Sequence, residues 1–309
     1  MWQPTDSGTK QSAVEATVVN VIASNVALGD GCSALPRAGR RRTMKHEINI
    51  GLPPAISVVV PVRNEAENVE PLLAEIQGAL DGVETFEIIY VDDGSEDGTI
   101  ERLVPAMQIY RALRVIRHAE GCGQSAALVT GVRNARAPWI VTLDGDGQND
   151  PADIAALLKL LHDSSQPFAP QLICGNRRRR QDNWIKRISS RIANGVRRMA
   201  LRDGTPDTGC GLKLFPREVF LALPQFDHMH RFLPSLVQAA GGKVVSVDVS
   251  HRPRQRGKTH YGVWDRLWVS LVDLAGVMWI ERRMKRPQAA ELSAPAELPE
   301  SSRRMSSHG

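Results

Sequence analysis

Trp139-Ile-Val-Thr-Leu-Asp-Gly-Asp-Gly-Gln-Asn-Asp-Pro151 carries the clearest structural signal in this chain of 309 residues. Its first five residues, through Leu143, are apolar or β-branched, as in a short strand buried on both faces. Two carboxylates, Asp144 and Asp146, follow at once, and a helical pattern runs from Pro151 to His162. A buried strand that ends in acidic residues and leads into a helix is the repeating unit of an α/β fold.

The same unit recurs on both sides of this stretch. Strands are predicted at 56–61, 86–91, 113–117 and 172–174, and helices at 64–80, from about 96, and at 124–134. Because these strands are apolar throughout and are separated by helices, they predict a mostly parallel sheet covered on both faces. This is a doubly wound, Rossmann-like α/β fold, in which ligands bind beyond the carboxyl ends of the strands.

Four carboxylates lie where that rule places a binding site. Asp92 and Asp93 follow the second predicted strand, as Asp144 and Asp146 follow the fourth. Such groups repel one another unless a cation or a set of donors compensates their charge. Asp144, Asp146 and the amide of Gln148 can face one hard cation with oxygen ligands. The pattern therefore predicts a divalent metal, Mg²⁺ or Mn²⁺, that holds a diphosphate.

Other interpretations of these acidic segments carry less weight. The segment 92–99 also suits a turn with a helix cap, and taken alone it favours neither interpretation. An EF-hand loop beginning at Asp144 needs Gly at 149 and Glu at 155, where this chain has Asn149 and Ala155. A haloacid-dehalogenase-type phosphatase has Thr or Val in the place of Gln148 and carries its motif on the first strand.

Six segments in a fixed order carry a resemblance to a known family. They are Val60-Pro-Val-Arg-Asn-Glu, Val91-Asp-Asp-Gly-Ser-Glu-Asp-Gly-Thr, Leu143-Asp-Gly-Asp-Gly-Gln-Asn-Asp-Pro, Gly175-Asn-Arg, Asp207-Thr-Gly-Cys-Gly-Leu-Lys and His251-Arg-Pro-Arg-Gln-Arg-Gly-Lys-Thr-His-Tyr-Gly. With them the chain resembles the family-2 glycosyltransferases with the GT-A fold. The resemblance is closer to the branch of dolichyl-phosphate mannose synthases and polyprenyl-phosphate glycosyltransferases, and it covers roughly residues 55 to 285.

The resemblance implies a role for each matching residue. The nucleotide pocket would be lined by Pro61, Asn64, Glu65, Asp92, Asp93 and Gly123, together with Asp144. The metal would be bound by Asp144, Asp146 and Gln148, and the catalytic residues would be Asp144, Asp146, Arg177 and Arg191. The acceptor phosphate would be bound by Arg187, Arg191, Arg254 and Lys258.

The chain departs from the family pattern at three places. Gly121-Cys-Gly replaces a segment that usually reads Lys or Asn, any residue, Gly, so no cation is expected there to help bind the nucleotide. Gly145 and Gly147 stand where relatives often have Ala and Leu, and a looser loop is expected without metal. The QxxRW string of processive synthases is absent, which favours a single transfer per acceptor.

The implied reaction is an inverting transfer of a sugar from a nucleoside diphosphate to a polyprenyl or dolichyl phosphate. Such a phosphate has its second pKa near 6, so it needs positioning rather than deprotonation. The alternative is a sugar or protein hydroxyl acceptor, which requires a carboxylate base, and Asp207 is then the candidate. A non-catalytic module that binds a nucleotide sugar or RNA is a third hypothesis, which the complete acidic set disfavours.

Charge and composition favour an enzyme at a membrane surface. The net charge is +5, and residues 175–202 carry ten Lys or Arg against one acid. A solvated helix face explains several of these, and a partner with anionic headgroups explains the rest. Trp184 is the one aromatic residue among them, so nucleic acid is not expected as a partner. Scattered cysteines and the lack of a leader or a long apolar run favour a cytoplasmic enzyme, peripheral on the inner membrane face.

Four regions are expected along the chain: a disordered extension at 1–50, the catalytic domain at 51–262, an amphipathic helix at 263–286 and a disordered tail at 287–309. Apolar residues of the third region recur at helical spacing, including Trp264, Trp268 and Trp279. A core-facing helix and a helix in the membrane interface are equally good interpretations. The enzyme would then bind the membrane surface directly or through a small membrane-protein partner.

Overall fold

The computed structural model describes residues 53–163, 169–177, 201, 204–253 and 263–285, with the backbone alone for 263–270. The chain divides into two compact units, 1–48 and 49–309, and the described residues all belong to the second. The expected extension at 1–50 and the tail at 287–309 lie outside the described residues. So do most of the basic segment, with Arg187 and Arg191, and the loop that holds Arg254 and Lys258.

A seven-stranded sheet forms the centre of the second unit, in the order β3-β2-β1-β4-β6-β5-β7. Its first four strands are mutually parallel: β1 (Ile56–Val62), β2 (Phe86–Asp92), β3 (Leu113–Arg117) and β4 (Trp139–Thr142). β6 (Lys213–Pro216) runs antiparallel to β4 and to β5 (Leu172–Arg177), and β7 (Val244–Val249) is parallel to β5. The mostly parallel α/β sheet is confirmed, and the antiparallel insertion of β6 is an addition.

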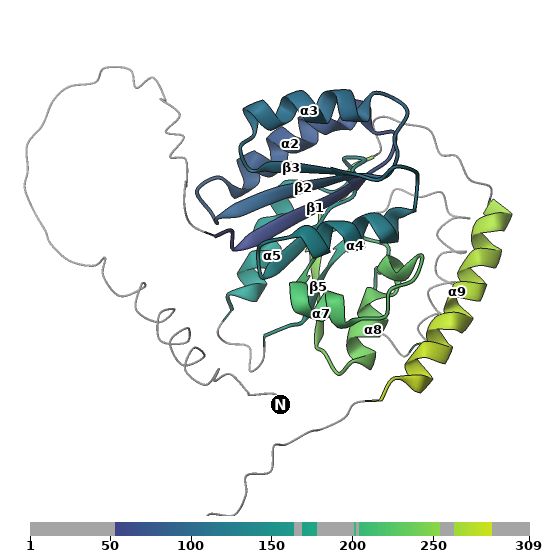
Figure 1. Cartoon of the computed structure of the whole chain (residues 1–309). Helices are drawn as coiled ribbons and strands as arrows, with labels where there is room; N and C mark the ends of the chain where they lie inside the picture. The colour runs from purple at the N-terminus through teal and green to yellow at the C-terminus, as the bar shows by residue number, and fades with distance from the viewer. Residues whose placement is uncertain (1–52, 164–168, 178–200, 202–203, 254–262, 286–309) are drawn as a thin grey trace, which may run out of the picture. The chain divides into compact units, whose positions relative to one another are not determined.

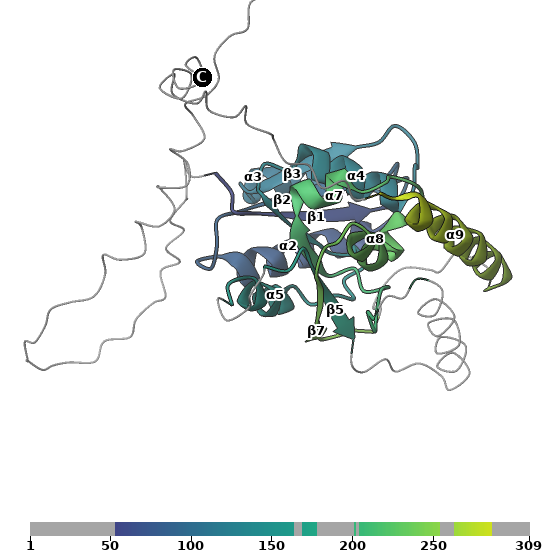
Figure 2. The same ribbon diagram turned by 90° about the horizontal axis from the view of Figure 1, so that it is seen from below.

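Helices cover both faces of this sheet (Figures 1 and 2). One face carries α2 (Ala66–Leu80), α3 (Thr99–Ile109) and α5 (Ile154–Leu161), the last preceded by the 3₁₀ turn η1 (Pro151–Asp153). The other carries α4 (Gln124–Asn134), α7 (Arg217–Ala222), η2 (Met229–Arg231), α8 (Leu233–Ala239) and α9 (Val263–Arg283). Strand β1 shows why: Val58 and Val60 join the first core cluster and Val59 the second, so the strand is buried on both sides.

Predicted and observed boundaries differ where polar turns intervene. The predicted bounds of β3 and α4 are confirmed to the residue. α2 begins at Ala66 rather than at 64 because Asn64 adopts a left-handed backbone with φ of 56°. α3 begins at Thr99 rather than near 96 because Gly98, with φ of 89°, precedes it. A residue with positive φ cannot continue a right-handed helix, so each turn delays the start of its helix.

Helix α9 has apolar residues on two sides. Val277 is buried, and Leu274, Met278 and Ile280 pack against the second core cluster. Leu271, Val272 and Trp279 are among the exposed large apolar side chains, with Trp279 63% exposed. Among the described residues, no helix combines the length and the apolar character that crossing a bilayer requires.

Candidate functional site

The turns after β1 and β2 are joined to each other by hydrogen bonds. Asn64 donates its backbone N–H to Ser95 Oγ at 2.9 Å and accepts from the Glu96 N–H through Oδ1 at 2.8 Å. Both bonds hold Asn64 in its left-handed conformation, which asparagine tolerates better than most residues do. Asn64 therefore links the two loops at the carboxyl edge of the sheet through hydrogen bonds.

Glu65 and Pro61 occupy different positions relative to that edge. The Glu65 N–H donates to Thr99 Oγ1 at 3.0 Å, and its carboxylate accepts from Asn68 Nδ2 at 2.6 Å. Pro61 is buried inside β1, opposite Val91. Glu65 thus lies at the start of α2 beside the turn, whereas Pro61 belongs to the wall of the sheet.

Asp92 is fully buried and organises the turn after β2. Its Oδ1 accepts from the Ser95 N–H at 3.2 Å, and Arg117 Nε lies 3.2 Å from its Oδ2. Asp92 therefore stabilises the conformation of a loop beside the predicted nucleotide pocket.

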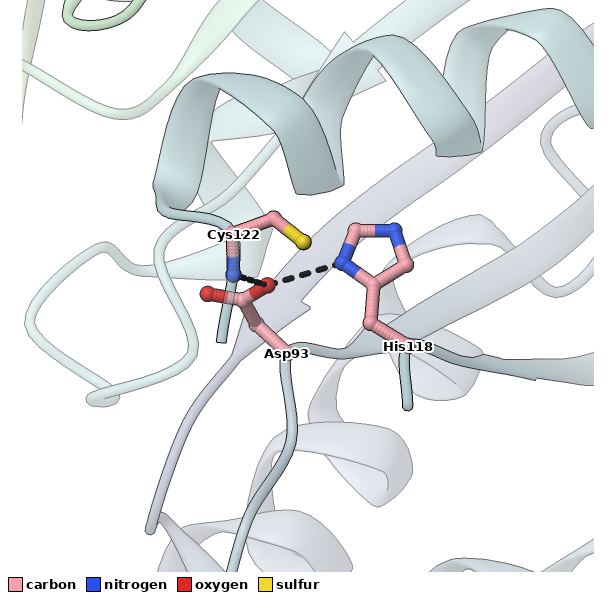
Figure 3. A group of neighbouring side chains, drawn as sticks. All are labelled: Asp93, His118 and Cys122. Carbon is pink, nitrogen blue, oxygen red and sulfur yellow. Dashed lines mark hydrogen bonds and ion pairs between the residues drawn. The ribbon is translucent and has the colours of Figure 1, made fainter. Parts of the chain in front are cut away.

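Asp93 ties the end of β2 to the start of α4 (Figure 3). Its Oδ1 accepts from the Cys122 N–H at 2.8 Å and lies 2.8 Å from His118 Nδ1, while its Oδ2 accepts from the Gly123 N–H at 2.8 Å. Burial alone would raise the pKa of Asp93, but these donors outweigh it and hold the pKa below its usual value. Asp93 is therefore stabilised in its ionised form at the N-terminus of α4.

Asp93, His118 and Cys122 also form a group whose candidate ligand atoms lie within 4.8 Å of one another. Both Asp93 oxygens already accept hydrogen bonds, and His118 Nε2 lies 2.9 Å from Thr130 Oγ1. A metal would have to displace these partners. A thiol and an imidazole also suit zinc better than Mg²⁺ or Mn²⁺. The group is therefore best described as a hydrogen-bonded network.

The loop after β4 presents Asp144 and Asp146. Gln124 Nε2 donates to Asp144 Oδ1 at 2.9 Å, and the Gln148 N–H donates to Asp146 Oδ1 at 3.1 Å. Asp150 caps η1 by accepting from the Ala152 N–H at 3.0 Å. Hydrogen bonds within the loop therefore stabilise its conformation. Asp144 lies at the edge of the loop, and its side chain is half-buried.

Asp144 has an electrostatic environment opposite to that of Asp93. Burial, and next to it the charge of Asp146, raise the pKa of Asp144, and the cations Lys213 and Arg177 offset this only in part. Two neighbouring carboxylates whose charge is compensated only in part fit a divalent cation, and their oxygens with the Gln148 amide suit Mg²⁺ or Mn²⁺. The residues present therefore fit the metal that the sequence predicts.

Close packing explains two glycines here. A Cβ on Gly211 would lie 2.2 Å from Asp144 Oδ2, and a Cβ on Gly145 would lie 2.4 Å from Val62 Cγ1. Gly147 has a φ of 71°, which L-amino acids with side chains rarely adopt. A glycine is therefore required at position 145 because β1 packs directly against it, and the sequence alone does not reveal this contact.

Arg177 and Asp207, predicted in separate roles, form a paired unit. Arg177 donates through Nε and Nη2 to the two carboxylate oxygens of Asp207 at 2.6 and 2.9 Å. Both side chains are largely buried, and the Gly209 N–H donates to Asp207 Oδ1 at 3.2 Å. This bidentate arrangement commits the Asp207 carboxylate to Arg177.

A pocket of about 180 Å³ opens beside Asp144. It is lined by Gln124, Leu128, Thr142, Leu143, Asp144, Thr208, Gly209, Cys210, Gly211, Lys213, His230, Arg231 and Leu233. Its polar lining contains two cations, Lys213 and Arg231, in addition to Asp144. Neither cation was assigned a role from the sequence, although Lys213 could have been noticed because it ends the Asp207-Thr-Gly-Cys-Gly-Leu-Lys segment.

His230 adds a neutral imidazole to this pocket. Ser125 Oγ accepts from the His230 backbone N–H at 3.4 Å and lies 2.8 Å from His230 Nδ1. The Ser125 hydroxyl therefore positions the imidazole from its Nδ1 side. Burial first, then the charges of Lys213, Arg231 and His228, lower the pKa of His230 to about 3.

Comparison with protein families and curated proteins identifies what the chain is similar to. Residues 57–223 match the model of glycosyl transferase family 2. The dodecaprenyl-phosphate galacturonate synthase of Rhizobium johnstonii is 32% identical over 240 residues, covering 75% of this chain and 69% of that protein. The undecaprenyl-phosphate 4-deoxy-4-formamido-L-arabinose transferase of Aeromonas hydrophila is 30% identical over 210 residues. That match covers 67% of this chain and 63% of the relative, so the chain spans less than two thirds of its length.

Solved structures share the fold at low sequence identity. Mannosyl-3-phosphoglycerate synthase from Rubrobacter xylanophilus superposes with a TM-score of 0.57 at 20% identity, covering 81% of this chain and 80% of the other. A mannosyltransferase from Pyrobaculum calidifontis, solved with GDP-Man and Mn²⁺, gives a TM-score of 0.52 at 21% identity. That superposition covers 76% of this chain and 66% of the other.

Proposed function

Since this chain belongs to glycosyl transferase family 2, we propose that it transfers a sugar from a nucleoside diphosphate to a polyprenyl phosphate. The chain is a glycosyltransferase with the GT-A fold, and two relatives carry dodecaprenyl or undecaprenyl phosphate in their names. The transfer inverts the anomeric carbon, depends on a divalent cation and takes place at the cytoplasmic face of the membrane. The charge of the pocket beside Asp144 is the observation that carries the acceptor class.

That pocket suits a phosphate better than a hydroxyl acceptor. Lys213 and Arg231 line it, and both are cations that can bind a phosphate. A hydroxyl acceptor requires a carboxylate base, and the candidate Asp207 is held by Arg177 in a bidentate pair. A phosphate near neutral pH is already largely dianionic and needs no base. These contacts favour the polyprenyl phosphate over the sugar or protein hydroxyl.

Each half of the site then has its own task. The loops after β1, β2 and β3 bind the nucleoside, and Asp93 keeps the start of α4 in place beneath it. Asp144, Asp146 and Gln148 would hold a divalent cation, which when bound would supply positive charge for the leaving diphosphate. Arg177 acts through Asp144, because its charge favours the ionised carboxylate. Lys213 and Arg231 orient the acceptor oxygen toward the anomeric carbon.

We retain Arg187, Arg191, Arg254 and Lys258 as further ligands of the acceptor phosphate. The exposed side chains Leu271, Val272 and Trp279 of α9, followed by Arg282 and Arg283, support contact with an anionic membrane surface. Arg283 lies 5.7 Å from the ring centroid of Trp279, so an indole and a guanidinium are presented together. The enzyme would be peripheral on the inner face, bound to lipid directly or through a small membrane protein.

The test is an assay of lipid-linked product. Purified protein is incubated with Mg²⁺ or Mn²⁺, vesicles containing undecaprenyl phosphate, and radiolabelled UDP-sugars and GDP-sugars in turn. Label is expected in the organic phase with one donor. It should disappear with EDTA, with Asp146→Ala and with vesicles that lack the polyprenyl phosphate. Release of nucleotide without organic-phase label would instead assign a hydroxyl acceptor.

A further inference from the structure

Gly121 is covered by a side chain from another part of the chain. A Cβ built on Gly121 would lie 2.3 Å from Arg63 Nη1, 2.5 Å from its Cζ and 2.8 Å from its Nη2. The guanidinium of Arg63 therefore occupies the space in which a side chain at position 121 would begin. The Gly121-Cys-Gly segment contains no cation of its own, but the guanidinium of Arg63 lies beside it.

The contact lies within the loops of the proposed nucleotide site. Arg63 follows β1 directly and precedes Asn64, which is bonded to the turn after β2. Gly121 in turn presses on that turn, since a Cβ on Gly94 would lie 2.8 Å from the Gly121 nitrogen. The next two backbone N–H groups, of Cys122 and Gly123, donate to Asp93. Arg63 is thus held over a loop whose backbone is already fixed.

The charge of Arg63 is available to a ligand. Its side chain is exposed, and its guanidinium has no carboxylate partner within the described part of the chain. Two other arginines near the site are paired, Arg177 with Asp207 and Arg117 with Asp92. A planar guanidinium can donate in a fork to phosphate oxygens or stack on a base, and both options suit a nucleotide.

We propose that Arg63 is the nucleotide-binding cation of this enzyme, supplied by the turn after β1 into the space that Gly121 leaves open. The ligand is a nucleoside diphosphate, so the assignment rests on the proposed function. A purely structural role, in which Arg63 only covers Gly121, is the competing explanation. The two explanations, nucleotide binding and a purely structural role, are distinguished by removing Arg63 and placing a lysine at position 121 instead.

Three variants of the full chain make that separation. Arg63→Ala removes the guanidinium and frees the space over Gly121. Arg63→Ala combined with Gly121→Lys restores a cation from the α4 side of the loop. Arg102→Ala is the control for charge, since Arg102 is an exposed arginine paired with Glu70 at 3.1 Å. Thermal melting of each variant establishes that it is folded.

The measurement is the affinity for UDP and for GDP by calorimetry with Mg²⁺. For the nucleotide that wild type binds, Arg63→Ala is expected to weaken binding about tenfold, as for the loss of one charged hydrogen bond. The double variant should recover to within about threefold of wild type, and Arg102→Ala should match wild type. In turnover assays Arg63→Ala should raise the donor KM with the acceptor KM unchanged.

Two results would overturn the assignment alone: Arg63→Ala binding as tightly as Arg102→Ala, or the double variant staying as weak as Arg63→Ala. Failure of wild type to bind either nucleotide would overturn the proposed function as well. The outcomes for the residue and for the enzyme class are therefore distinguishable.

Discussion

Asp93 and Asp144 each follow a buried parallel strand at the same edge of the sheet, yet their surroundings differ in sign. Asp93 accepts two backbone N–H groups and lies against His118, and its pKa is lowered. Asp144 is bonded to one amide and faces Asp146, and its pKa is raised. The negative charge of Asp93 is compensated by donors of the protein itself, whereas that of Asp144 is compensated only in part by Lys213 and Arg177.

The two aspartates therefore contribute to different properties of the site. The loops around Asp93 are cross-linked before any ligand arrives, which fixes the geometry of nucleotide binding in advance. Around Asp144, burial of the carboxylate and repulsion from Asp146 destabilise the folded protein, and a bound divalent cation would offset both effects. Mutations in the two halves should therefore separate stability from turnover.

Asp144→Asn should have the largest effect on turnover. Removal of one carboxylate from the metal-binding pair should lower kcat about 10³-fold, a loss comparable to that of an oxyanion donor. The free energy of unfolding without metal should stay level or rise, because the repulsion from Asp146 disappears. Organic-phase label and urea denaturation measure the two effects, with Asp81→Asn, an exposed aspartate, as control. A clear fall in stability would show that Asp144 resembles Asp93 after all.

Gly211→Ala tests how closely the backbone supports Asp144. The added methyl would lie 2.2 Å from Asp144 Oδ2, so the carboxylate must move. A displacement of about 1 Å at a reacting centre lowers kcat about 10²-fold, and the same loss is expected here. Gly78→Ala is the matched control, because nothing lies within 4 Å of its Cβ. Equal activity of the two variants would remove Gly211 from the site.

The sequence predicted the half around Asp93 and the acidic loop better than it predicted the pocket. Strand and helix periodicity is local, so β1 to β4 and α2 to α5 follow from nearby residues. β6 is four residues long and antiparallel, and its place between β4 and β5 depends on pairing with Val141 and Ile173, far away in sequence. Since β6 carries Lys213, the pocket beside Asp144 stayed hidden together with the strand.

Side chains that cross between loops were also beyond local patterns. From the sequence, Gly121 indicated that the segment lacks a cation. A sequence motif does not show which distant side chain covers a glycine. Arg63 lies 58 positions earlier and reaches that space only once β1 and β2 are paired. The pairing of Arg177 with Asp207 is similar, since each was predicted separately and their contact depends on the tertiary fold.

Asp93→Asn should act on stability, in contrast to Asp144→Asn. The new amide would place an NH₂ group against a backbone N–H that now donates to the carboxylate. Loss of charged hydrogen bonds of this kind costs about 2 kcal/mol of the free energy of unfolding. Urea denaturation measures it against Asp81→Asn, and hydrogen exchange at Cys122 and Gly123 should accelerate. Unchanged stability would mean that the loop is held by its backbone alone.

The smallest effect concerns His230, which lies in the half around Asp144 and is neutral mainly because it is buried and also because Lys213 and Arg231 already supply positive charge there. Its pKa falls from 6.5 in the unfolded chain to about 3 in the folded protein. As pH decreases below 6.5 the unfolded chain takes up a proton that the folded protein refuses, so stability is present above pH 6.5 and is lost toward pH 3. Between pH 7.5 and 5.5 this amounts to about 1 kcal/mol. Urea denaturation at both pH values should show that loss reduced in His230→Gln. It should be unchanged in His162→Gln, whose side chain is 60% exposed.

An equal loss in His230→Gln and wild type would mean that the imidazole is already charged in the folded protein. The pocket would then hold three cations beside Asp144 rather than two cations and a neutral imidazole.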